Sequence, residues 1–169
     1  MEIAKILIPV LAVLATAYLL LDRMLKNDEG RRMFELRKQS HSMLTPIRLR
    51  AYERLALFLE RTSPNALILS IISPEMNCMQ LHTKLLETIR QEYSHNIAQQ
   101  VYVSEDVWDG VIASKESLIK LFNACAAYCD ADEPATVLAE RIIDAYTSTE
   151  TTPTEIALER LKEEVKKYF

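Results

Sequence analysis

The residues with the clearest capacity for chemistry are three cysteines and a histidine at helical intervals. Cys78 and His82 lie four residues apart, as do Cys125 and Cys129. Side chains at this spacing share one helix face, and thiolate sulfur and imidazole nitrogen are ligands that zinc prefers. If the two segments pair as an antiparallel hairpin turning near residue 103, all four side chains meet at one end. Cysteine is also a common buried residue, so we expect core packing and keep a Cys3His zinc site as the alternative.

No other pattern in the sequence argues for catalysis. Glu92 and His95 form a Glu-x-x-His pair, but a di-iron bundle needs a second copy, which the sequence lacks. No nucleophile stands beside a base in a recognisable pattern. The chain has 2 glycines, too few for the turns that cradle phosphates or dinucleotides. We therefore expect a protein that is not an enzyme and binds no cofactor.

The elements that would position these residues are predicted to be helices. Few glycines make an all-β fold a poor candidate, and four of the 6 prolines follow Ser or Thr, the pattern of an N-cap before the first helical residue. These pairs are Thr45-Pro46, Ser63-Pro64, Ser73-Pro74 and Thr152-Pro153. The predicted fold is all-α, with helices near 46–62, 64–72, 75–101, 105–129, 133–147 and 153–168. The short apolar stretch 66–72 could alternatively form a strand.

The two longest predicted helices form the expected antiparallel hairpin at the centre of a helical bundle. Apolar residues recur at helical spacing in both of them, and Ser104 is placed to cap the second after a short connection. The expected core residues are Leu85, Leu86, Ile89, Tyr93, Ile97, Val107, Val111, Leu118, Leu121 and Phe122.

A 19-residue apolar run at 3–21 predicts a transmembrane anchor. A helix of this length spans about 28 Å, close to the hydrocarbon thickness of a bilayer. A signal peptide cleaved after Ala17, which would release a periplasmic or secreted helical protein, is the alternative. Positive charges cluster after the run, so the positive-inside rule predicts a single-pass protein of the bacterial inner membrane with a cytoplasmic C-terminal domain. These charges are Arg23, Lys26, Arg31, Arg32, Arg37 and Lys38.

Charge is divided unevenly along the chain, whose net charge is -4. Residues 22–61 carry ten Lys and Arg against six acids, whereas residues 62–169 carry nine against 17. The basic part sets membrane topology or touches anionic lipid, and the overall balance argues against a nucleic-acid partner. The expected organisation is an anchor, a basic juxtamembrane helix and linker, a helical domain, and a flexible link with an amphipathic helix, over residues 1–21, 22–45, 46–147 and 148–169.

The last predicted helix carries an apolar stripe of Leu158, Leu161, Val165 and Tyr168. We expect this stripe to pack on its own domain. Docking in a groove of a partner is the alternative, since the polar link at 147–152 would let the helix swing out.

Charged, amide and aromatic residues on two segments predict a surface that contacts another protein. The alternative for the aromatic members is that they cap the core. The expected contact residues are Arg50, Tyr52, Arg54, Glu60, Arg61, His95, Asn96, Gln99, Gln100 and Trp108.

Four sequence blocks near these residues resemble an uncharacterised family of small single-pass inner-membrane proteins from Bacteroidota. The blocks are Ile47–Leu55, Leu57–Arg61, Glu92–Asn96 and Gln99–Ser104. The resemblance implies an inner-membrane protein with a cytoplasmic helical domain, and no reaction or cofactor. The prediction is therefore a membrane-tethered interaction module, an accessory or scaffold subunit with an unidentified protein partner. A metal-binding helical domain is the runner-up, and self-association stays open because small residues in the anchor permit close approach.

Overall fold

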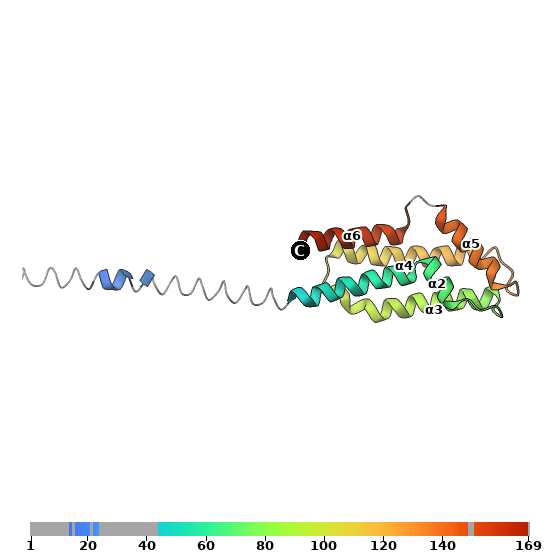
Figure 1. Ribbon diagram of the computed structural model, residues 1–169, viewed down its shortest axis with the longest axis horizontal. Helices are drawn as coiled ribbons and strands as arrows, with labels where there is room; N and C mark the ends of the chain where they lie inside the picture. Colours follow the sequence, from blue (N-terminus) through green and yellow to red (C-terminus); the bar gives the residue numbers. More distant parts are fainter. Residues whose placement is uncertain (1–13, 15, 21, 24–43, 149–150, 169) are drawn as a thin grey trace, which may run out of the picture. The chain divides into compact units, whose positions relative to one another are not determined.

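The computed structural model describes residues 14, 16–20, 22–23, 44–148 and 151–168, and the regular secondary structure of those residues is helical (Figure 1). One isolated bridge joins Asn77 to Pro134. The chain divides into two compact units, Met1–Pro46 and Ile47–Phe169. The described residues of the first unit are helical. The predicted all-α class is confirmed for the described part of the chain.

The second unit is a bundle around one central helix. Residues 47–62 continue a helix described from residue 44. There follow α2 (Pro64–Ile71), α3 (Cys78–Asn96), the 3-10 helix η1 (Ile97–Val101), α4 (Glu105–Ala126), α5 (Ala135–Thr147) and α6 (Pro153–Tyr168). α4 contacts α3, α5 and α6, and Figure 1 shows α6 running alongside α4. The alternative of a strand at 66–72 is wrong, because those residues lie in or directly after α2.

The predicted antiparallel hairpin is formed by α3 and α4. At one end the ring of Tyr93 stacks on Trp108, with centroids 5.7 Å apart. At the other end His82 hydrogen-bonds to Asn123, with 2.9 Å between Nε2 and Oδ1. Early residues of α3 thus face late residues of α4, which fixes the register of the cysteine-bearing segments.

Side-chain caps begin three of the described helices, at two of the predicted places and one unpredicted place. α2 begins after Ser63 as predicted, but Ser63 makes no side-chain cap hydrogen bond. Ser104 caps α4, and Thr152 and Glu155 form a reciprocal capping box at α6. The predicted start at Ser73-Pro74 is wrong, because these residues lie in a turn. α3 begins at Cys78, where Asn77 and Gln80 satisfy each other's backbone N–H groups.

Two separate hydrophobic clusters form the core of the bundle. One combines α2, α3, the second half of α4 and α5, around Leu81, Leu85, Phe122 and Leu138. The other combines the 44–62 helix, the first half of α4 and α6, around Leu55, Phe58, Val111 and Leu161. α4 is the helix that contributes buried residues to both clusters, and α3 adds the partly buried Tyr93 to the second. Most of the predicted hairpin core is buried or partly buried, but Ile97 lies 46% exposed at the start of η1.

α6 packs on α4, as expected, but through a face rotated from the predicted stripe. Ala157, Leu161 and Glu164 are buried, whereas Tyr168 is 53% exposed. Leu158 and Val165 are partly buried against the same cluster. The rotation follows from Glu164, which turns inward to hydrogen-bond partners on other segments.

Within the described part of the chain, no helix combines the length and apolarity needed to cross a bilayer. Of the expected anchor at 3–21, residues 14 and 16–20 are described, and they are helical and exposed. The remainder of that run, and residues 24–43 of the basic segment, lie outside the described residues.

Candidate functional site

A surface groove of about 390 Å³ lies between the 44–62 helix and the end of α3. One wall carries Arg54 and Arg61, which lie about two helical turns apart on the same face. The facing wall carries Glu92, His95 and Asn96, and Leu57 and Phe58 supply apolar surface. Phe58 is buried and Leu57 is 57% exposed. The groove therefore combines cationic, amide and apolar groups around one hollow.

The groove has more positive than negative charge. Arg61 lies 3.9 Å from Glu92 between Nη1 and Oε1, and its side chain is 69% exposed. An ion pair this long and open contributes little. The side chains of Arg54 and His95 form no ion pair and no hydrogen bond with residues 44–148 and 151–168. Two guanidinium groups thus face a single carboxylate, and one of them has no protein partner among those residues.

Four of the predicted contact residues are brought together in this groove: Arg54, Arg61, His95 and Asn96. They come from segments more than 30 positions apart in the sequence. Asn96 is also held by its own helix, because its Nδ2 donates to the carbonyl of Glu92 at 2.8 Å.

Two other predicted contact residues belong to the core instead. Tyr52 is 3% exposed and Trp108 is 9% exposed, and both pack in the cluster that includes α6. Neither offers surface to a partner, because both rings are covered by the bundle itself. For Trp108 the alternative prediction, that it caps the core, is the correct one.

The remaining predicted contact residues lie outside the groove lining. Arg50 and Glu60 are exposed on the 44–62 helix, Gln100 is exposed on η1, and Gln99 is half-buried there. The sequence prediction missed Leu57, whose exposed apolar side chain lies between the two arginines along the helix. Its position four residues before Arg61 was the available signal.

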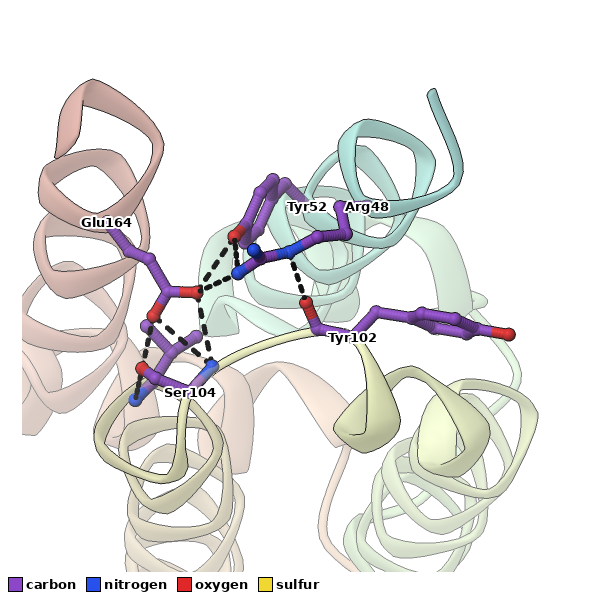
Figure 2. A network of polar contacts seen from close by, with 6 residues as sticks. Arg48, Tyr52, Tyr102, Ser104 and Glu164 are labelled. Atoms are coloured by element: carbon purple, nitrogen blue, oxygen red, sulfur yellow. Dashed lines mark hydrogen bonds and ion pairs between the residues drawn. The ribbon is translucent and has the colours of Figure 1, made fainter. Parts of the chain in front are cut away.

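A second polar centre, which the sequence did not indicate, surrounds Glu164 at the end of α6. Figure 2 shows this carboxylate between the 44–62 helix and the start of α4. It accepts hydrogen bonds from the hydroxyl of Tyr52 at 2.8 Å, from the backbone N–H of Ser104 at 3.1 Å, and from the Ser104 hydroxyl. Arg48 Nη2 lies 3.4 Å from Oε1 of Glu164.

This network binds three distant segments to one buried charge. Glu164 stands at the N-terminus of α4, where a negative charge is favoured by the helix dipole. Arg48 also donates from Nε to the carbonyl of Tyr102 at 3.0 Å and stacks over the ring of Tyr168 at 4.2 Å. Burial, and then the hydrogen bond to Glu164, raise the pKa of Tyr52 to about 12. The network therefore holds the end of α6 against the 44–62 helix and the start of α4.

The four residues of the predicted zinc set do not converge as a group. Cys78 and Cys129 do meet, but their third neighbour is Glu133. His82 is bound to Asn123. The Cys125 thiol faces the carbonyl of Arg141 at 3.7 Å, and burial raises the pKa of that thiol. The Cys3His arrangement is therefore wrong, because α4 ends at Ala126 and the loop that follows carries Cys129 to Cys78 without Cys125.

Comparison with known proteins places the chain in a family. A model described as "Family of unknown function (DUF7935)" matches residues 1–168, and the chain belongs to that family. No curated protein and no solved structure matches the chain.

Proposed function

We propose that this protein is a membrane-tethered interaction module whose groove binds an acidic segment of a partner protein. The occupant is a peptide segment with a carboxylate beside an apolar side chain. The observation that carries the proposal is that one groove is lined both by the exposed side chain of Leu57 and by Arg54, whose guanidinium has no ion-pair or hydrogen-bond partner among the described residues. Guanidinium binds carboxylate in a planar, two-pronged geometry, and arginine is common at the energetic centres of interfaces.

The proposed tether rests on the amino-terminal sequence. Residues 3–21 are long and apolar enough to span a bilayer, and the Lys and Arg that follow would keep the bundle on the cytoplasmic side. A domain held there meets membrane proteins at high local concentration. The proposed role is that of an accessory or scaffold subunit of an inner-membrane complex.

Photo-crosslinking from the groove tests this proposal. A photoreactive residue replaces Leu57 in the full chain, in cells, and the membranes are then washed at alkaline pH. Leu69, which is 78% exposed on α2, gives the matched control position. We expect the chain to stay with the membranes and to form an adduct at position 57, absent at position 69, with a peptide that contains an acidic residue.

The charge requirement is tested in the same experiment. Arg54→Glu should abolish the adduct at position 57, and Arg54→Lys should retain part of it. Arg90→Glu is the matched control, because Arg90 is exposed on α3 and does not line the groove. The proposal is overturned by an adduct that survives Arg54→Glu, by an adduct with phospholipid or with a second copy of the chain, or by release of the chain from the membrane.

A further inference from the structure

Three metal-binding side chains converge at the end of the bundle near the start of α3. Cys78 is the first residue of α3, and Cys129 and Glu133 belong to the loop between α4 and α5. The two sulfur atoms and a carboxylate oxygen of Glu133 all lie within 4.8 Å of one another. Neither the proposed partner groove nor the Glu164 network includes any of these three residues.

Backbone hydrogen bonds hold the loop that carries two of these donors. The N–H groups of Cys78 and Met79 donate to the carbonyls of Glu133 and Ala131, at 2.8 and 3.3 Å. The N–H of Ala135 donates to the carbonyl of Met76 at 3.0 Å. The loop is therefore fixed on the start of α3 by its main chain. Within the loop, the N–H of Asp130 donates to Oε2 of Glu133 at 3.0 Å, so this contact must lengthen or be shared when the carboxylate binds an ion.

The exposure of the three side chains provides an entry path for an ion. Cys78 is buried, with 3% of its surface exposed, whereas Cys129 and Glu133 are half-buried. The thiol of Cys78 donates to the carbonyl of Pro134, at 3.3 Å, and that of Cys129 to the carbonyl of Cys125, at 3.5 Å. The two thiols also interact with each other. These are weak contacts that metal–sulfur bonds would replace.

We propose that Cys78, Cys129 and Glu133 bind one zinc ion, with water in the fourth position. Two thiolates and a carboxylate form a donor set suited to Zn²⁺. Donors in a tetrahedral zinc site lie roughly 3.5 Å apart, so the loop side chains need to move by no more than about 1 Å. Binding replaces two S–H bonds by two Zn–S bonds and releases two protons, while Glu133 binds as the carboxylate that it already is. This inference does not depend on the proposed function of the groove.

Metal binding to the purified full chain, reduced beforehand with a phosphine, tests the site. We expect one Zn²⁺ per chain by elemental analysis and native mass spectrometry, with two protons released. Co²⁺ in the same site should give sulfur-to-metal charge-transfer bands and the visible absorption of tetrahedral coordination. Cys129→Ser and Glu133→Gln should each weaken Zn²⁺ binding by at least about 100-fold, beyond the usual effect of residues that only support a ligand.

Two control variants show whether the nearby thiol and imidazole take part in binding. Cys125→Ser removes a thiol one turn before Cys129, and His82→Ala removes the imidazole one turn after Cys78; both should keep full binding and the same Co²⁺ spectrum. Glu133→Gln changes a partly exposed loop residue, so its circular dichroism should match that of the unmodified chain. Equal loss in Cys125→Ser, unchanged binding in Glu133→Gln, or no stoichiometric zinc in the unmodified chain would overturn the proposal.

Discussion

The two ends of the bundle bury reactive groups in different ways. At the end of α6, the carboxylate of Glu164 is surrounded by donors from Arg48, Tyr52 and Ser104 (Figure 2). At the start of α3, the thiols of Cys78 and Cys129 donate to backbone carbonyls and interact with each other. A buried charge requires a full set of directed donors, whereas a thiol can pack as a small apolar group. The arrangement around Glu164 thus depends on directed hydrogen bonds, whereas the arrangement around the two thiols depends on how well the side chains pack.

Removal of the buried carboxylate should have the largest effect. Glu164→Ala leaves Tyr52, Ser104 and Arg48 without their shared acceptor, so we expect a loss of about 3 kcal/mol in the free energy of unfolding. Urea unfolding of the full chain, followed by helical circular dichroism, measures it. Glu163→Ala is the matched control, because Glu163 is exposed, and should cost less than about 0.5 kcal/mol. Equal costs at the two positions would remove the contrast between the ends.

Removal of a thiol at the other end should cost less. In the presence of a chelator, Cys78→Ala deletes one buried sulfur and its weak bond to the Pro134 carbonyl, and we expect a loss of about 1 kcal/mol. The same urea titration measures it. Cys129→Ala, at a half-buried position, should cost less than Cys78→Ala. A cost at Cys78 as large as that at Glu164 would show that this end depends on more than packing.

Tyr52→Phe should have an effect at neutral pH similar to that of Cys78→Ala, and it is the most diagnostic of these variants in alkali. Loss of the hydrogen bond to Glu164 should cost about 1 kcal/mol. The pKa of Tyr52 is about 12 in the folded protein and about 10 in the unfolded chain. Between these values the unfolded chain releases a proton that the folded chain retains, so this contribution to stability falls as pH rises.

Comparison of the two proteins across this pH range isolates the Tyr52 contribution. The other tyrosines titrate in both, so the difference in unfolding free energy between the unmodified chain and Tyr52→Phe should shrink from about pH 10 to about pH 12. Urea titrations at several pH values measure it. A difference that stays constant across that range would mean that the Tyr52 hydroxyl is not held by Glu164.

Local signals in the sequence predicted the helices and part of the candidate site. The capping box of Thr152 and Glu155 joins residues three positions apart, so the local sequence is enough to predict it. The start of α3 was misplaced because Ser73-Pro74 and Asn77–Gln80 are competing local signals, and the second satisfies two backbone donors by side chains. The spacing of the predicted hairpin brought Cys78 and Cys129 together. The predicted second helix extended to residue 129, whereas α4 ends at Ala126, and the loop that follows places Glu133 beside the two cysteines.

The amino-acid sequence alone determined the all-helical class, the α3–α4 hairpin and the two segments that carry the predicted contact residues, because helix propensity, capping and periodicity act over a few residues. Only the tertiary structure decided that Tyr52 and Trp108 are core residues and that α6 turns Glu164 inward. The partners of Glu164 lie 60 to 116 positions away. Local periodicity carries no information on partners so distant in the sequence. The free energy of burying a carboxylate depends on whether the fold brings hydrogen-bond donors to it.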